Sequence, residues 1–182
     1  MKHLPIWFLG QVPHEECDRA AKEFNAIFPK DAVMGVDGEV VDKVNRDTTV
    51  RFTDKDNLFG KQMYGYGAQA NIECKWNFNL NDFEAVQYAE YGPGQHYNWH
   101  VDTFFLSGKG YDRKITVVCL MNDTSEFEGG DLQLRFGGQE YTAPLAKGSV
   151  IAFPSFIEHR VTPVILGLRY TATMWVNGAE FR

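Results

Sequence analysis

The sequence predicts a mainly β protein with flanking helices, and three observations favour this class. From Phe83 onwards, short β-rich runs alternate with turn signals. Helical spacing of apolar residues is confined to the chain before that point. A hydrophobic content of 44% in 182 residues suffices for one sizeable core. We therefore expect a single domain over residues 1–182, in which a double-sheet jelly roll over 83–177 is supported by a region over 1–82 whose helices pack on one sheet.

The N-terminal region begins with a predicted strand and a predicted helix. Residues 1–10 favour a short strand with an apolar side. Pro13 and the acidic residues after it suit the first turn of a helix, because proline needs no hydrogen-bond donor there and carboxylates favour the positive helix end. Pro29 ends this helix. Its predicted apolar face consists of Cys17, Ala20, Ala21, Phe24, Ile27 and Phe28.

A second helix is predicted further along this region. Residues 31–46 favour a loop with weak strand character, and the β-branched run 48–52 favours a strand. Over residues 56–74, aromatic and apolar residues recur at helical spacing, although each of three glycines costs about 1 kcal/mol of helix stability. We expect a helix here, with its aromatic stripe in the core.

Eight β-rich runs in the C-terminal region predict the strands of the jelly roll. Glycine-containing turns such as Gly92-Pro93-Gly94 separate them. The runs are Phe83–Tyr91, Tyr97–Thr103, Lys114–Met121, Asp131–Phe136, Glu140–Thr142, Ser149–Phe153, Glu158–Thr162 and Leu168–Val176.

Charge and hydropathy argue against several kinds of partner. A net charge of −6 gives no attraction to phosphate backbones or anionic lipid, so we expect no nucleic acid as partner. No apolar window reaches the length of a membrane span, and the apolar start is too short for a signal peptide. The three cysteines lack metal-binding spacing. These features predict a cytoplasmic protein without a membrane partner.

The segment from Tyr91 to Asp102 holds the first candidate site. His100 and Asp102 are two residues apart, and in an extended segment such residues point to the same face. An imidazole and a carboxylate on one face supply two of the three ligands of a facial iron site. The motif alone is weak, because five histidines give roughly 0.3 such matches by chance.

The last two predicted strands hold a second histidine and an arginine. If Thr162 pairs with Leu168 in a hairpin, His159 lies opposite Thr171 and Arg169 is its diagonal neighbour, about 7–8 Å away. A buried arginine needs an anionic partner. We therefore expect Arg169 to face inward beside His159 and to bind an anion. Thr171, Thr173 and Trp175 continue the same inward face.

These residues resemble the 2-oxoglutarate- and iron(II)-dependent dioxygenases, in the prolyl 4-hydroxylase-like or PKHD-type branch. The resemblance covers roughly residues 83–177, about half of the chain. The matching residues are the His-Val-Asp of 100–102, the Glu-Gly-Gly-Asp-Leu of 128–132, His159, Pro163, Val164, Gly167, Arg169, Met174 and Trp175.

The resemblance implies a double-stranded β-helix, that is, a jelly roll. It implies iron(II) held by His100, Asp102 and His159, and the C5 carboxylate of 2-oxoglutarate paired with Arg169. It further implies O2 as co-substrate, ascorbate as reductant, no catalytic residue beyond the metal ligands, and a monomer or weak dimer. Hydroxylation of a prolyl residue in a peptide or protein, with succinate and CO2 as co-products, is the implied reaction.

Several further residues match positions near the co-substrate or the substrate in related hydroxylases. Tyr91, Tyr97 and Thr173 are candidates for binding 2-oxoglutarate, and Trp175 for lining the substrate cleft, while a plain core role stays open for each. Leu120 departs from the pattern, because some relatives place a 2-oxoglutarate-binding tyrosine there. For Trp99, Phe104 and Phe105, which flank the motif, we favour core packing over a cleft wall. For His96, in the Gly-Pro-Gly turn, we favour a solvated side chain.

Other functions stay open beside this one. A free amino acid or small metabolite is an alternative substrate. A jelly-roll binding module leaves an inward arginine unexplained, and metal-dependent cupins use more histidines. The nucleic-acid demethylases of the same superfamily carry a second arginine where this chain has Trp175.

Overall fold

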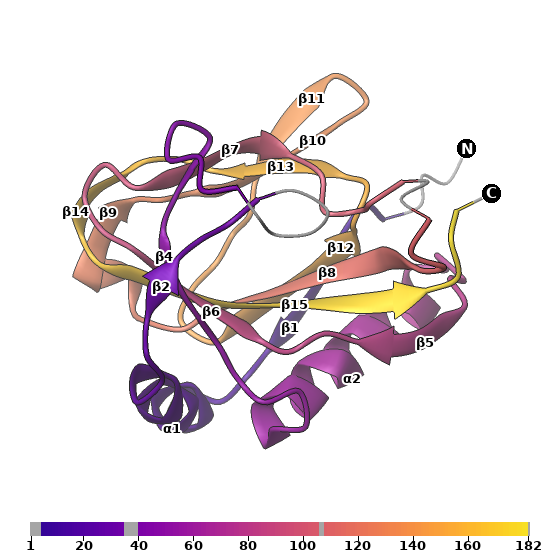
Figure 1. Ribbon diagram of the computed structural model, residues 1–182, viewed down its shortest axis with the longest axis horizontal. Coiled ribbons are helices and arrows are strands. Elements are labelled where there is room, and N and C mark those ends of the chain that lie inside the picture. The colour runs from indigo at the N-terminus through magenta and orange to yellow at the C-terminus, as the bar shows by residue number, and fades with distance from the viewer. Residues whose placement is uncertain (1–4, 35–39, 106–107, 182) are drawn as a thin grey trace.

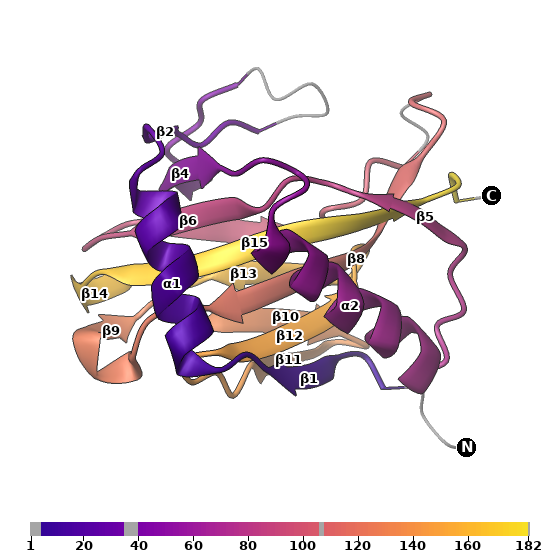
Figure 2. The same cartoon turned by 90° about the horizontal axis from the view of Figure 1, so that it is seen from below.

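Two β-sheets face each other, and two helices cover the outer face of the larger sheet (Figures 1 and 2). The structure, a computed structural model, describes residues 5–34, 40–105 and 108–181. Its mainly β architecture with flanking helices confirms the predicted fold class.

The larger sheet contains the long central strands. Its neighbours follow the order β1 (Phe8–Gln11), β12 (Ser149–Pro154), β8 (Asp112–Leu120), β15 (Arg169–Gly178), β6 (Gln87–Tyr91), β4 (Thr49–Phe52) and β2 (Lys30–Asp31), with β5 (Leu80–Phe83) also paired to β15. β8 and β15 are largely buried because helices pack on one side and the second sheet on the other.

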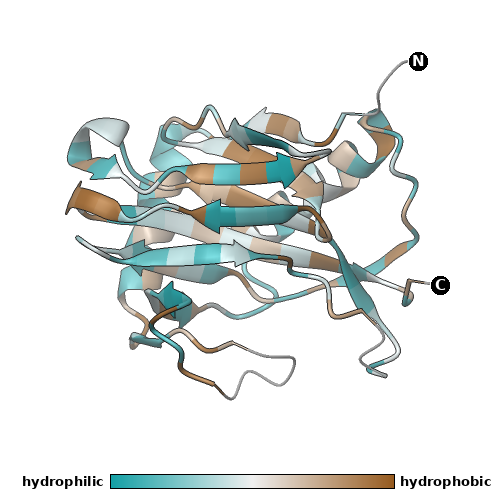
Figure 3. Cartoon of the chain, turned by 90° about the horizontal axis from the view of Figure 1, so that it is seen from above, coloured by the Kyte–Doolittle hydropathy of each residue, from teal (hydrophilic) through white to brown (hydrophobic). Residues whose placement is uncertain are grey.

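The smaller sheet follows the order β11 (Gln139–Thr142), β10 (Leu132–Phe136), β13 (Glu158–Val161), β7 (His96–His100) and β3 (Arg46–Asp47). Beside it lie the pair β14 (Val164–Gly167) and β9 (Phe127–Gly129), and the 3-10 turn η1 (Thr124–Glu126). Leu132 and Leu134 of β10 are buried while the residues between and after them are more exposed. Figure 3 shows hydrophilic and hydrophobic bands along the strands. This alternation is typical of strands that face a core on one side and solvent on the other.

The helices α1 (His14–Asn25) and α2 (Leu58–Glu73) bury the outer face of the larger sheet. Phe24, Met63 and Tyr88 lie in this core. A Cβ at Gly67 would lie 2.9 Å from a methyl group of Val176, so this glycine lets α2 approach the sheet closely. No helix in the described ranges is long and apolar enough to span a membrane.

The predicted elements of the first half were placed correctly in outline. The first helix ends at Asn25 rather than Pro29, and Phe28 is 90% exposed, so the predicted apolar face does not extend that far. The strand predicted over residues 1–10 shortens to β1, and residues 1–4 lie outside the described ranges. The run Phe83–Tyr91 divides into the end of β5 and all of β6.

The predicted hairpin of the last two strands was wrong. β13 pairs with β10 and β7 in the smaller sheet, whereas β15 pairs with β8, β6 and β5 in the larger one. The residues assigned to the hairpin loop form β14, which pairs with β9 while the chain passes from one sheet to the other. His159 and Arg169 therefore face the same interior from opposite sheets.

Candidate metal centre

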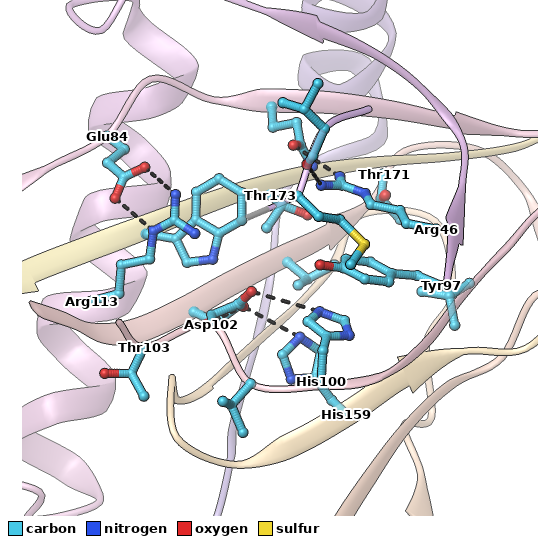
Figure 4. Close-up of a pocket in the computed structure, with 18 of the residues that line it drawn as sticks. Arg46, Glu84, Tyr97, His100, Asp102, Thr103, Arg113, His159, Thr171 and Thr173 are labelled. Atoms are coloured by element: carbon cyan, nitrogen blue, oxygen red, sulfur yellow. Dashed lines mark hydrogen bonds and ion pairs between the residues drawn. The ribbon is translucent and has the colours of Figure 1, made fainter. Parts of the chain in front are cut away.

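A pocket of about 530 Å³ opens between the two sheets, lined by residues from both. Arg169, Thr171, Thr173 and Trp175 of β15 line it from the larger sheet, as their alternation predicted. His100, Asp102 and His159 line it from the side of the smaller sheet (Figure 4).

Strand pairing brings the two histidines together. His100 at the end of β7 and His159 in β13 are register partners, and their ring centroids lie 4.1 Å apart. Asp102, just past β7, has Oδ1 at 3.7 Å from Nε2 of His100 and Oδ2 at 3.3 Å from Nε2 of His159. One ligand atom from each of the three residues lies within 4.8 Å of the others. Two imidazoles and one carboxylate form the donor set of facial iron(II) sites.

Backbone carbonyls orient both imidazoles toward this cluster. Nδ1 of His100 lies 2.7 Å from the carbonyl oxygen of Asn98, and Nδ1 of His159 lies 2.9 Å from that of Ile157. With Nδ1–H as donor, the lone pair of each Nε2 is left for a metal. Burial, together with the charge of the neighbouring His159, lowers the pKa of His100 to about 3, so this ring is neutral at pH 7.

The hydroxyl of Thr116 holds the carboxylate of Asp102. The Thr116 hydroxyl donates to Oδ2 of Asp102 at 2.7 Å, and it lies 3.0 Å from the Ser155 hydroxyl. The backbone N–H of Asp102 donates to the Ser155 carbonyl at 2.9 Å. Burial by itself raises the pKa of Asp102, but the two neighbouring histidines, His159 before His100, outweigh it and lower that pKa. The carboxylate is therefore ionised, and its orientation is set by hydrogen bonds within the protein.

Thr116→Val removes the hydroxyl that orients Asp102 and nearly preserves side-chain volume. Groups that orient ligands typically contribute about 10–100-fold to metal affinity, and we expect a loss in that range. Anaerobic titration with Co(II), followed by its visible absorption, measures the change. Thr142→Val, at the exposed end of β11, is the matched control and should bind Co(II) like the unaltered chain. Equal affinity in both variants would contradict the role assigned to Thr116.

Arg169 is a buried cation without an anionic partner. Its side chain is 2% exposed, Nη1 has no hydrogen-bond partner, and no carboxylate of the described residues forms an ion pair with it. Burial lowers the pKa of this guanidinium. A Cβ at Gly130, where φ is +67°, would meet Cδ of Arg169 at 2.6 Å, so glycine makes room for the arginine. A small anion in the pocket would supply the missing partner.

The predicted supporting residues all line the pocket. Tyr91 is the register partner of Arg169, whose guanidinium carbon lies 5.6 Å from the tyrosine ring. Tyr97 stacks on His100 at 3.5 Å between ring centroids, with 12° between the planes. Burial raises the pKa of Tyr97 to about 12. Leu120 is buried opposite Thr171 and is absent from the pocket lining.

Sequence reasoning missed four charged residues of the pocket lining, namely Arg46, Glu84, Lys109 and Arg113. Arg46 of β3 is buried, and Arg113 of β8 forms two hydrogen bonds with Glu84, at 2.7 Å and 2.6 Å. The Arg113 guanidinium lies 3.8 Å from the Trp175 ring centroid. In the sequence these charged residues look like ordinary surface residues, so no local pattern identifies them as part of the pocket lining.

The aromatic residues that flank the histidine motif do not form the core. The Trp99 ring contacts the guanidinium groups of Arg135 and Arg160, at 4.0 Å and 4.6 Å from its centroid, and Phe105 is 51% exposed. Phe104 lines the pocket. His96 begins β7, is half-buried and places Nε2 3.0 Å from the carbonyl of Val44, outside the metal cluster.

Sequence comparison finds similar proteins that are named PKHD-type hydroxylases. A PKHD-type hydroxylase of Picosynechococcus sp. is 36% identical over 109 residues, which cover 60% of this chain and 49% of the relative. A PKHD-type hydroxylase of Synechococcus sp. is also 36% identical, over 46% of this chain and 37% of the relative. The matched segment thus spans half or less of the length of these relatives.

Solved structures share the fold. A prolyl-4-hydroxylase of Pseudomonas putida superimposes with a TM-score of 0.69 at 20% identity, covering 97% of this chain and 94% of that one. The viral collagen prolyl hydroxylase of Paramecium Bursaria Chlorella virus-1, in its 2OG complex, gives 0.70 at 19% identity, over 96% and 97% of the two chains. The profile of the 2OG-Fe(II) oxygenase superfamily matches residues 86–177, half of the sequence, and the chain therefore belongs to that superfamily.

Proposed function

We propose that this chain is an Fe(II)- and 2-oxoglutarate-dependent dioxygenase that hydroxylates a C–H bond and releases succinate and CO2. One observation supports it above all. Three ligand atoms of the facial iron type converge in a pocket that also contains Arg169, a buried cation that forms no ion pair with any carboxylate of the described residues. A dicarboxylate with one end at the metal and the other at Arg169 satisfies both.

Each lining residue then has a defined task. His100, Asp102 and His159 would hold iron(II), and Arg169 with Tyr91 would hold the C5 carboxylate of 2-oxoglutarate. When bound, iron and 2-oxoglutarate supply the oxidising chemistry with O2. Val118, Leu132 and Val161 give the pocket apolar walls that exclude water. Tyr97, Thr173 and Trp175 contact the co-substrate or the substrate, and no further side chain acts as general acid or base.

The proposed substrate is a prolyl residue in a peptide or protein. Support comes from the similar proteins, which are named PKHD-type hydroxylases and prolyl hydroxylases. A prolyl hydroxylase of Trichoplax adhaerens, with a TM-score of 0.69 at 15% identity, was solved with a peptide fragment bound and covers 94% of this chain. A cytoplasmic monomer or weak dimer, with ascorbate as reductant, completes the proposal.

Succinate release tests this function directly. The purified chain with Fe(II), 2-oxoglutarate, O2 and ascorbate should release succinate slowly alone and faster with a suitable proline-containing peptide. Mass spectrometry should find one added oxygen atom in that peptide. Omission of Fe(II) in the presence of a chelator is the control. Absence of succinate under every condition, with no thermal stabilisation by 2-oxoglutarate, would contradict the proposal.

A further inference from the structure

Arg46 is a second buried cation in the same pocket. It lies in β3 at the edge of the smaller sheet and is 7% exposed. Its Nη1 donates to the carbonyl of Val33 at 3.2 Å, and its Nη2 donates to Oε1 of Gln87 at 3.0 Å. Nε has no partner. Both acceptors are neutral, so they leave the charge of Arg46 uncompensated.

The other two arginines of the pocket lining differ from Arg46, because one already pairs with a carboxylate and the other would do so once the co-substrate binds. Arg113 is neutralised by Glu84 through two hydrogen bonds. Arg169 would be neutralised by the C5 carboxylate of 2-oxoglutarate, on the proposed function. Among the described residues, no carboxylate forms an ion pair with Arg46. Of these three arginines, Arg46 alone still lacks a counter-charge once metal and co-substrate are bound.

Arg46 also lies close to the metal centre. Its guanidinium carbon is 4.6 Å from the ring centroid of Tyr97, and that ring stacks at 3.5 Å on His100. A single aromatic ring thus separates the guanidinium from a candidate metal ligand, and Figure 4 draws Arg46 and His100 on opposite sides of Tyr97. An anionic group at Arg46 would lie within the length of a small substrate from the metal.

We propose that Arg46 binds a carboxylate of the primary substrate, located near the C–H bond that is hydroxylated. This inference rests on the proposed function and specifies its substrate class. A guanidinium has more N–H donors than its two present acceptors use, and a carboxylate matches its planar fork. Two sources provide this chemistry: the α-carboxylate of a free amino acid, and an acidic side chain next to the target residue of a peptide.

Matched substrate pairs separate these sources. One pair is acetyl-Ala-Pro-Glu amide and acetyl-Ala-Pro-Gln amide, and the other is L-proline and L-prolinamide. In the pair that the chain accepts better, we expect the substrate with the carboxylate to have a kcat/KM for succinate release about tenfold or more above that of its amide counterpart. A hydrogen bond to a charged group contributes a free energy of this size. Anaerobic calorimetry on the chain loaded with Co(II) and 2-oxoglutarate should show the same preference as a difference in Kd, without turnover.

Variants of Arg46 test whether this side chain causes the preference for the substrate that carries a carboxylate. Arg46→Met should remove it, while Arg46→Lys should retain part of it because the charge remains. Arg51→Met is the matched control: Arg51 lies in neighbouring β4, pairs with Glu90 at 3.1 Å and is absent from the pocket lining, so the preference should persist. Thermal unfolding and Co(II) titration check each variant for folding.

Three results would overturn the inference: no preference for either carboxylate in the unaltered chain, an undiminished preference in Arg46→Met, or an effect of that variant only on the KM for 2-oxoglutarate. If Arg46→Met does not fold, an undiminished preference in Arg46→Ala or Arg46→Gln is equally decisive. A lack of succinate with a carboxylate preference intact in calorimetry would contradict the proposed function alone.

Discussion

Asp102→Ala is expected to abolish tight metal binding and all turnover. The variant removes the carboxylate that both Nε2 atoms approach and leaves only two imidazoles to hold a dication. Groups that merely orient a ligand contribute about 10–100-fold to affinity, so the loss of the ligand itself should exceed the upper end of that range. Anaerobic Co(II) titration and succinate release measure the two effects.

The matched control for this variant is Asp18→Ala. Asp18 is an exposed carboxylate that pairs with Lys147 at 2.6 Å and is absent from the pocket lining. It should bind Co(II) and release succinate like the unaltered chain. Full activity in Asp102→Ala would disprove the assignment of the metal site.

Arg169→Ala is expected to lose most turnover while metal binding survives, because the three candidate ligands are untouched. Truncating one partner of a buried charge pair typically costs about 2–5 kcal/mol, and we expect the KM for 2-oxoglutarate to rise accordingly. Arg169→Lys keeps the charge but loses the fork geometry, so it should raise that KM more than it lowers kcat. Initial rates of succinate release over a range of 2-oxoglutarate concentrations separate these effects.

Stability gives a readout of Arg169 that does not depend on turnover. Without an anion, the buried guanidinium is uncompensated, so Arg169→Met should unfold at the same temperature as the unaltered chain or a higher one. Addition of 2-oxoglutarate with Co(II) at one hundred times its Kd should stabilise the unaltered chain by about 2.7 kcal/mol, and the variant much less. Arg160→Met, on the outer side of the smaller sheet, is the control. Equal stabilisation of Arg169→Met would exclude Arg169 as the anchor.

The sequence by itself determined the fold class and the principal candidate residues. The i, i+2 spacing of His100 and Asp102 places both on one face of an extended segment, and the structure has both in the pocket. The alternation from Arg169 to Trp175 likewise predicted which side chains of the last strand point inward. Both inferences depend only on the period of a strand, which is a local property of the backbone.

Only the tertiary structure decided which strands lie beside one another. The period of a strand identifies its inward face but not its sheet, so His159 and Arg169 were placed in one hairpin although they face each other from two sheets. The contact between Arg46 and Tyr97 joins segments about fifty positions apart in the sequence. Such pairings depend on how the two sheets close over one core, since the packing of that core favours a long-range partner over the nearest strand in sequence.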